Sequence, residues 1–239
     1  LIQPTDLGVC SYTVSGSGFD VTANDNCDIL SITHNYTGAP LSSTLDGAEF
    51  AAGTTVVTWI AEDLSGNKDT CEIEIEILDS QAPVLAPGSN CPADAVLAAN
   101  LNECEQIYTW TPPSEALDLC DGSILRTSGQ IREVLIDPKG DTSSIFPQFD
   151  YDMQPITGGF IQQAQFPVGV SRILYIASDN EGNSDTICEF TVTIQDLEVP
   201  VIICPADQIL TTNCDEFPIP NYTALPNVQD NCPKNITVS

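Results

Sequence analysis

Cysteines and carboxylates dominate the side chains of this 239-residue chain that could do chemistry. It contains 10 cysteines, and 34 Asp and Glu residues stand against 6 Lys and Arg, for a formal net charge of -28. The cysteines could form disulfides, hold zinc or act in redox catalysis. There is no Cys-x-x-Cys pair and His34 is the only histidine, so the usual ligand sets of structural zinc sites are missing. The cysteines recur beside similar neighbours, which favours a disulfide framework in an oxidising compartment.

Catalytic groups are scarce. A Ser-His-Asp or Cys-His nucleophile would need His34, and we expect that histidine at the surface, on a strand or at its edge. So many acids always supply pairs of carboxylates for glycoside hydrolysis, but no two stand isolated in apolar sequence. No glycine-rich phosphate loop is present. We therefore predict that the chain is not an enzyme.

The charge balance limits the partners. An acidic surface repels phosphate backbones and anionic lipid headgroups, so we predict no nucleic-acid partner and no direct membrane insertion. No apolar run approaches the roughly 20 residues of a membrane helix. Hydrophobic residues still make up 42% of the chain, which favours folding over disorder.

Local periodicity predicts strands. Four runs alternate apolar with polar or small residues, the period-two pattern of a strand with one buried face. The runs are 57–61, 71–77, 173–177 and 188–194. An Asp-x-x-Gly-Asn turn, at 63–67 and 179–183, joins each pair into a hairpin. We expect Trp59 and Trp110 to pack in cores rather than serve as carbohydrate platforms.

The chain repeats itself. Residues 50–79 align with 166–196, and a Pro-containing linker follows each. Cys91-Pro-Ala-Asp recurs at Cys204, and the chain starts and stops inside repeats, as a fragment or processed piece would. The predicted domains are 1–79, a repeat lacking its N-terminal segment; 80–196, a complete repeat; and 197–239, the N-terminal part of a third.

Many short strands without a helical stripe predict an all-β fold of tandem immunoglobulin-like β-sandwich repeats. The middle repeat holds about 24 more residues between Cys120 and Cys188 than the first holds between Cys27 and Cys71. We place this insertion near 128–162, as an added hairpin or long loop on the sandwich edge. It is either a binding loop or a tolerated surface insertion.

The order of motifs resembles the hyalin repeat, or HYR domain. The middle repeat carries the whole set, including Cys91-Pro-Ala-Asp, Trp110-Thr-Pro, Phe166-Pro-Val-Gly and the alternating run from Cys188. The resemblance implies an extracellular, immunoglobulin-like module associated with adhesion. It implies a secreted or cell-surface location. Acidity and four cysteines per repeat make the chain most similar to the repeats of large Bacteroidota surface adhesins.

A seven-strand sandwich of this type places its first and last strands side by side, so Cys91–Cys188 is the first disulfide we predict. Elimination then gives Cys104–Cys120, Cys10–Cys27 and Cys214–Cys232. Four cysteines allow three connectivities, and the sequence leaves the choice open. Cys71 and Cys204 would have partners outside this chain.

The same geometry brings the linker of one repeat to the B–C and F–G loops of the next. At the first joint it gathers Asp79, Asp118, Asp121, Asp179 and Glu181; at the second it gathers Asp196, Glu198, Asp230 and Asn231. Clustered hard oxygen ligands suit calcium, the one cofactor we predict. The alternative is that these residues cap turns and solvate a hinge.

Together these features predict a non-catalytic extracellular segment of a large cell-surface adhesin or filament, acting in adhesion or as a stalk. Its partners are neighbouring repeats of the same chain, and surface glycans or proteins. One alternative is a dedicated glycan- or protein-binding module that uses the 128–162 insertion. Another is an accessory domain of a secreted enzyme.

Overall fold

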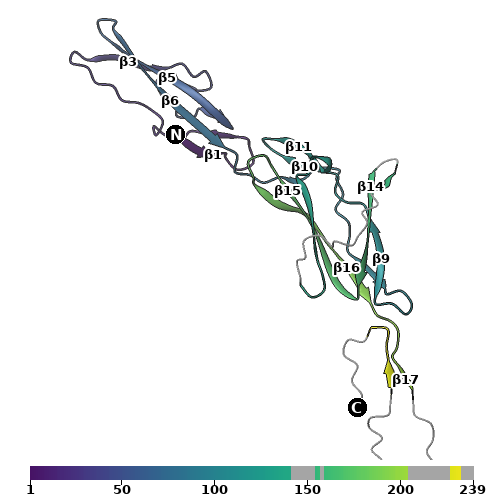
Figure 1. Ribbon diagram of the computed structural model, residues 1–239. Helices are drawn as coiled ribbons and strands as arrows, with labels where there is room; N and C mark the ends of the chain where they lie inside the picture. The colour runs from purple at the N-terminus through teal and green to yellow at the C-terminus, as the bar shows by residue number, and fades with distance from the viewer. Residues whose placement is uncertain (141–153, 157–158, 204–226, 233–239) are drawn as a thin grey trace, which may run out of the picture. The chain divides into compact units, whose positions relative to one another are not determined.

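The computed structural model describes residues 1–140, 154–156, 159–203 and 227–232. Strands dominate these residues, and the helical structure among them is one short 3-10 turn, Arg126–Ser128 (Figure 1). No helix in the described ranges is long and apolar enough to span a bilayer. The all-β prediction is confirmed. The chain divides into two compact units: 1–89 with 113–132 and 175–187, and 90–112 with 133–174 and 188–239.

The first repeat forms a sandwich of two sheets. One sheet has the order β1-β6-β5-β3, and the other pairs β2 with β4. The strands are β1 (Ile2–Pro4), β2 (Ser11–Thr13), β3 (Ile29–His34), β4 (Glu49–Ala51), β5 (Gly53–Asp63) and β6 (Lys68–Leu78). β1 runs parallel to β6, whereas β5 and β6 form the long antiparallel hairpin that the alternating runs predicted. This is the A′-G-F-C and B-E arrangement of an immunoglobulin-like sandwich.

The core of the first sandwich lies between these sheets. Phe50 from β4, Val57 and Trp59 from β5, and Ile75 and Ile77 from β6 are almost completely buried. Trp59 is 1% exposed, so its predicted place in the core is confirmed. Burying one such aromatic or aliphatic side chain stabilises the fold by roughly 1.5–3 kcal/mol.

The second repeat follows the same plan. Its main sheet has the order β12-β15-β16-β8, and its opposing sheet the order β13-β14-β9. The strands are β8 (Ala95–Ala98), β9 (Glu105–Trp110), β12 (Ile131–Ile136), β13 (Gln154–Ile156), β14 (Gly159–Pro167), β15 (Gly169–Ser178) and β16 (Ser184–Gln195). β8 runs parallel to β16 as β1 does to β6. Trp110 is 6% exposed and packs against Phe166 and Phe190, so this tryptophan also lies in a core.

Three further short strands precede β12 in sequence and form a separate sheet. β7 (Val84–Leu85), β10 (Glu115–Asp118) and β11 (Gly122–Leu125) form a sheet with the order β11-β10-β7. Asp118 is the last residue of β10, and Cys120 lies in the loop between β10 and β11. Of the third repeat, the described residues contain β17 (Val201–Ile203) paired with β18 (Asn227–Gln229).

The extra length of the second repeat is divided rather than placed in one insertion at 128–162. That segment contains β12, which occupies the position of β3 in the main sheet. One residue, Asp28, lies between Cys27 and β3, whereas ten residues, 121–130, lie between Cys120 and β12. The remaining extra residues follow β12, and 141–153 and 157–158 lie outside the described residues.

The disulfides correct part of the predicted pairing. Cys91 is bonded to Cys188, as predicted, with their Cα atoms 5.4 Å apart. The other two bridges are Cys10–Cys120 and Cys104–Cys232, with Cα separations of 5.0 and 5.2 Å. The predictions Cys10–Cys27, Cys104–Cys120 and Cys214–Cys232 are therefore wrong. They assumed that every bridge closes within one repeat, whereas these two join a loop of one repeat to a loop of the next. Cys214 itself lies outside the described residues.

His34 is not the surface residue that the sequence suggested. It ends β3 with its ring 8% exposed and edge-on to Trp59. Its Nδ1 accepts from the Tyr36 backbone N–H, so Nε2 carries the proton and lies 2.9 Å from the Leu41 carbonyl oxygen and 3.1 Å from that of Thr44. These bonds satisfy both ring nitrogens, and the histidine is a structural tie between β3 and the following loop.

Candidate functional site

The site is the first joint, where the linker at 79–83 meets the loops at the near end of the second sandwich. All of its residues belong to one compact unit. Gln81 fixes the linker to the preceding repeat: its Oε1 accepts from the Gly8 N–H at 2.6 Å, and its Nε2 donates to the carbonyls of Asp6 and Val9 at 3.1 and 2.8 Å. The linker is therefore held in place on its N-terminal side.

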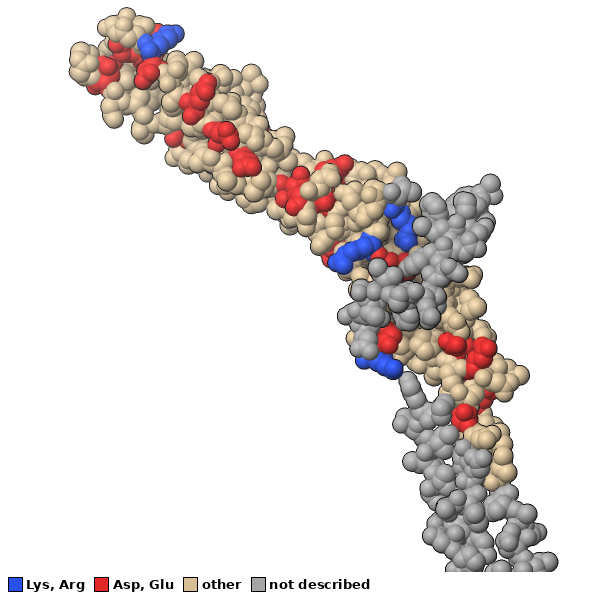
Figure 2. Space-filling model, viewed as in Figure 1, with Lys and Arg blue, Asp and Glu red and all other residues tan. Residues whose placement is uncertain are grey.

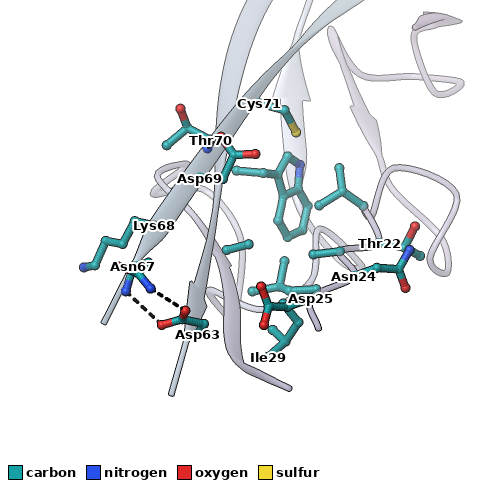
Figure 3. A pocket seen from close by; sticks show the side chains of 15 residues that line it. Thr22, Asn24, Asp25, Ile29, Asp63, Asn67, Lys68, Asp69, Thr70 and Cys71 are labelled. Atoms are coloured by element: carbon teal, nitrogen blue, oxygen red, sulfur yellow. Dashed lines mark hydrogen bonds between the residues drawn. The ribbon is translucent and has the colours of Figure 1, made fainter. Parts of the chain in front are cut away.

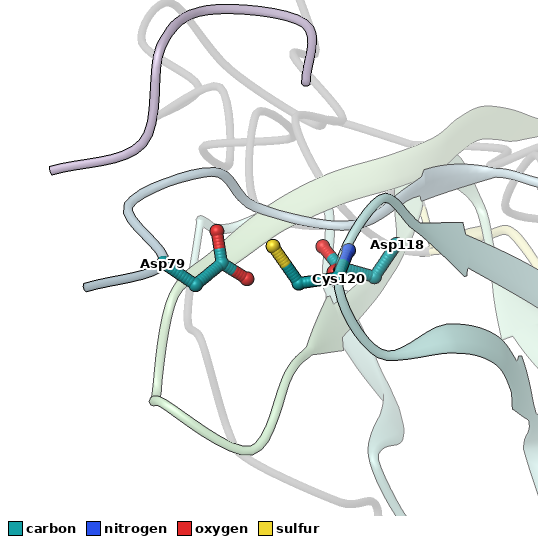
Figure 4. A group of neighbouring side chains, drawn as sticks. All are labelled: Asp79, Asp118 and Cys120. Atoms are coloured by element: carbon teal, nitrogen blue, oxygen red, sulfur yellow. The ribbon is translucent and has the colours of Figure 1, made fainter. Parts of the chain in front are cut away.

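Two buried carboxylates face each other across this joint. Asp79 in the linker is 9% exposed, and Asp118, at the end of β10, is 3% exposed. One oxygen of each carboxylate is used in a turn: Asp79 Oδ1 accepts from the Gln81 N–H, and Asp118 Oδ1 from the N–H groups of Cys120 and Asp121. The second oxygen of each, Oδ2, is buried and has no hydrogen-bond partner among the described residues. Figure 4 shows both carboxylates directed toward the same space.

The F–G turn brings further oxygens to Asp79. Asp179 is 6% exposed and accepts from the backbone and side-chain N–H groups of Asn183, each at 2.7 Å. The Asn183 side chain also donates to the Asp79 backbone carbonyl at 3.1 Å, which ties the turn to the linker. Glu181 lies in the same turn, and carboxylate oxygens of Asp79, Asp179 and Glu181 lie within 4.8 Å of one another.

Asp121 completes the predicted set of acids. Its Oδ2 accepts from the Asn180 N–H at 2.9 Å, so this carboxylate joins the B–C loop to the F–G turn. The structure thus brings Asp79, Asp118, Asp121, Asp179 and Glu181 together at the first joint, as the sequence predicted.

The carboxylates of the joint repel one another when no cation is bound. Burial raises the pKa of Asp79, and the charges of Asp118, Asp179 and Asp121 raise it further. Desolvation and the nearby Asp121 likewise raise the pKa of Glu181. All of the charges acting on these two carboxyls are negative, so a bound cation would relieve the repulsion.

The donor set suits a hard divalent cation. Two oxygens on opposite sides of one Ca²⁺ lie at most about 5 Å apart, since each Ca–O distance is about 2.3–2.6 Å. Two groups of three ligand atoms meet that limit within 4.8 Å in the described residues: Asp79 with Asp118 and Cys120, and Asp79 with Asp179 and Glu181. The Cys120 sulfur is bonded to Cys10 and is not a thiolate, which leaves carboxylates alone. Asp79 belongs to both groups and is the residue through which they could share one ion.

The second joint repeats several of these contacts. Glu198 stands where Gln81 does and accepts from the Asn102 N–H at 2.9 Å, as Gln81 accepts from Gly8. Asp230 caps the Cys232 N–H at 2.8 Å, as Asp118 caps Cys120. Asp196 caps the N–H of Glu198 at 3.1 Å. Glu198, Asp230 and Asn231 line one hollow at this joint, but neither Asp196 nor Asp230 belongs to a three-ligand group in the described ranges.

The cross-repeat disulfides are the part of the site that the sequence analysis missed. Cys10 and Cys104 occupy equivalent positions just before the first strand of the opposing sheet, β2 or β9. Each is bonded to the cysteine of an Asp-x-Cys motif in the following repeat. The signal was available: if Asp118 lies at the joint, Cys120, two residues later, must lie there as well.

Acidic side chains also line the surface beyond the joint. Figure 2 shows Asp and Glu along the visible face of the first sandwich, with few Lys or Arg among them. The alternation of β6 places Glu72, Glu74 and Glu76 on its outer face. Mutual repulsion between such surfaces favours solubility and opposes association with other acidic partners.

Comparison with known proteins agrees with the repeat pattern. The HYR domain model matches residues 19–77 and 152–194. Hyalin of Strongylocentrotus purpuratus is 27% identical over 194 residues, which is 79% of this chain and 13% of that protein. Hyalin of Lytechinus variegatus is 25% identical over 165 residues, or 68% of this chain and 25% of that protein. The chain therefore spans a quarter or less of the length of these relatives.

Among solved structures, extracellular cadherin domains 1–4 of protocadherin gamma B7 align at 16% identity, covering 87% of this chain and 53% of that one, with a TM-score of 0.31. The family-model match covers the strands β3 to β6 of the first sandwich and β13 to β16 of the second. The HYR domain model therefore matches parts of the first two repeats, and the chain is similar to hyalin over most of its length.

Proposed function

We propose that the chain is a non-catalytic, mechanical segment of an extracellular repeat protein, which acts as a stalk or within an adhesin. The observation that carries this proposal is the disulfide that joins one repeat to the next, found at two equivalent joints as Cys10–Cys120 and Cys104–Cys232. A binding or catalytic module does not need its neighbours to be bonded covalently. In a repeat array each unit contacts only its neighbours, so a covalent bond at each of these contacts strengthens the connection along a stalk.

Each bridge closes a long loop. The two cross-repeat bridges span 110 and 128 residues, so in the chain-entropy account each stabilises the folded array by roughly 4–5 kcal/mol. In the folded state the same bond limits bending at the joint, where Gln81 already anchors the linker. Bridges and linker contacts together favour a stiff connection.

Calcium forms the second part of the proposed function. The ion would bind at the first joint through Asp79, Asp118, Asp179 and Glu181, with Asp121 close by. The support is the pair of buried, unpartnered Oδ2 atoms of Asp79 and Asp118, together with the exclusively negative charges around them. Bound calcium would replace repulsion between the linker and the two loops by shared coordination, and so oppose hinge motion.

An extracellular location fits the chemistry. Disulfides persist in oxidising compartments, and three of them occur in the described residues. The similarity to hyalin supports an adhesion-type role, while the likeness to Bacteroidota adhesins remains a prediction from the motifs. Neighbouring repeats are the proposed partners within the chain, and surface glycans or proteins are the proposed partners outside it.

Small-angle X-ray scattering tests the stalk proposal. The variant Cys10→Ser with Cys120→Ser loses the cross-repeat bridge, whereas Cys91→Ser with Cys188→Ser loses a bridge inside one repeat. We expect the first variant to broaden the distribution of interatomic distances at unchanged strand content, and the control to leave the long distances as they are. An identical distribution for wild type and the Cys10/Cys120 variant would contradict the proposal.

A further inference from the structure

The far end of the first sandwich is less covered than the equivalent end of the second. Cys188, at the start of the last long strand, is 4% exposed, whereas its counterpart Cys71 is exposed and unpaired. Ala177 is completely buried, whereas Ala61 is only half-buried. The residues are the same or similar in type, so the difference lies in what covers them.

A hollow of about 460 Å³ lies at this end of the first sandwich. Figure 3 shows it between the Asp63–Asn67 turn and the loop that carries Asp25, with Cys71 at its edge. Trp59 and Ile32 contribute apolar surface to it, and the rim is acidic and polar. The hollow therefore combines an apolar floor, carboxylates and a free thiol.

The side chains of the rim are arranged like those of the first joint. Asp25 caps the Cys27 N–H at 2.7 Å, as Asp118 caps that of Cys120. Asp63 accepts from both N–H groups of Asn67, as Asp179 does from Asn183. The end of the first sandwich thus presents the receiving half of a joint.

In the second sandwich, the receiving half of the joint is covered by the part of the chain that precedes this sandwich. The linker carbonyl of Asp79 accepts from the Asn183 side chain. Cys91, which follows that linker, is bonded to Cys188, and Asp94 caps the Thr191 N–H at 2.7 Å. Cys120 is bonded to Cys10 of the repeat before it. These four contacts come from the preceding repeat, from its linker and from the segment that directly follows the linker.

We propose that the hollow at Asp25, Asp63 and Cys71 is the docking surface for a preceding repeat of the same type and its linker, and that Cys27 and Cys71 each form a disulfide there. Cys27 pairs with the cysteine that stands where Cys10 stands in this chain. Cys71 pairs with a cysteine in the segment directly before Leu1. The linker between the preceding repeat and the first sandwich carries an acidic residue in the position of Asp79. This inference rests on the proposed repeat array.

Strand register gives the position of the second partner. Ile2 pairs with Glu76, and Val96 pairs with Thr193. Glu76 and Thr193 each lie five residues after the cysteine of their strand, Cys71 or Cys188, so Ile2 and Val96 are equivalent. Cys91 lies five residues before Val96, so the partner of Cys71 is expected five residues before Ile2 in the natural chain.

Each bridge forms by oxidation of two thiols. The two sulfurs join with loss of two protons and two electrons, and a disulfide-carrying oxidoreductase of the export compartment accepts the electrons and is reduced to its dithiol. No further reactant is required.

The test compares two samples under native conditions: the 239-residue chain and the full-length natural protein. Both are treated with N-ethylmaleimide, digested with pepsin at acid pH to prevent exchange, and mapped by mass spectrometry without reduction. We expect Cys27 and Cys71 to be alkylated in the short chain and unmodified in the natural protein. In the natural protein, Cys71 should be linked to a peptide that contains the residues just before Leu1. Cys27 should be linked to a peptide of the preceding repeat.

Alkylation of both cysteines in the natural protein would overturn the proposal, as would a Cys27–Cys71 bond in either sample. The Cys10–Cys120 linkage in the same digests separates the two ideas. If that linkage is found while Cys27 and Cys71 are free, the docking surface is refuted and the proposed array stands. If that linkage is absent, the array itself fails.

Discussion

Calcium should stabilise the first joint by an amount that depends on Asp118. A carboxylate oxygen of the buried Asp79 lies within 4.8 Å of one of the buried Asp118. At an effective dielectric constant of about 20, two like charges at that separation repel by roughly 3.5 kcal/mol. A divalent cation between them converts this repulsion into coordination, which is the origin of the expected gain.

The size of this stabilisation depends on the affinity of the joint for calcium. Extracellular carboxylate sites bind calcium with dissociation constants of about 10⁻⁴–10⁻³ M. At a constant of ~10⁻⁴ M, about 10 mM calcium stabilises the folded joint by roughly 2.7 kcal/mol. For a cooperative unit of more than 100 residues, this raises the melting temperature by about 5–10 °C. In Asp118→Asn, which keeps the oxygen that caps Cys120 but loses a charged ligand, a tenfold weaker affinity would halve the gain.

Differential scanning calorimetry with calcium, magnesium or EGTA measures these shifts. Asp25→Asn is the matched control, because Asp25 caps its turn as Asp118 does but lies exposed at the far end of the first sandwich. We expect wild type and Asp25→Asn to respond alike to calcium, and Asp118→Asn to respond about half as much. Equal melting temperatures with calcium and EGTA in wild type would refute the calcium site.

Three other perturbations follow from the same contacts. Burial raises the pKa of the Asp79 carboxyl, so the folded joint binds the proton of this carboxyl more tightly than the unfolded chain does. Without calcium, the protein therefore loses stability as the pH rises from the usual carboxyl range through the raised pKa. In urea titrations with EGTA, Asp79→Asn should become more stable relative to wild type across that pH range, and a constant difference in stability would contradict this. Gln81→Ala loses its bonds to Gly8, Asp6 and Val9 and should destabilise the joint by about 1–2 kcal/mol in chemical denaturation, whereas no change would mean that the linker is not anchored there. Trp59→Ala empties a core position that is 1% exposed and should cost about 3–5 kcal/mol, and a cost below about 1 kcal/mol would indicate a loosely packed core.

The sandwiches were predictable because their signals are local. Alternation in 71–77 and 188–194 fixes which face is buried, and the Asp63 and Asp179 turns close each hairpin within five residues. The pairing of Cys91 with Cys188 follows from the parallel neighbours β8 and β16, which any sandwich of this type contains. These features can be predicted without knowing how neighbouring repeats contact each other.

The cross-repeat bridges were not predicted because they depend on contacts between repeats. Elimination among Cys10, Cys27, Cys104 and Cys120 treated each repeat as closed. The linker geometry that correctly gathered Asp79 with Asp118 also moves Cys120 away from its own repeat and toward Cys10. The linker geometry that places Asp118 at the joint also places Cys120 there, because the two residues are only two positions apart.

The burial of His34 was missed for a related reason. Alternation from Ile32 places this side chain on the inner face of β3, but a histidine is expected there only if its nitrogens find partners. Those partners are carbonyls of the loop at 41–44, whose path the local sequence does not reveal.

A disulfide map of the oxidised 239-residue chain tests whether neighbouring repeats are covalently joined. Digestion at acid pH without reduction, followed by mass spectrometry, identifies which cysteine-containing peptides are linked. We expect Cys10 to be linked to Cys120 and Cys104 to Cys232, with Cys91 linked to Cys188 inside the second repeat. Linkage of Cys10 to Cys27 and of Cys104 to Cys120 would mean that each repeat closes on itself, and the covalently joined array would be contradicted.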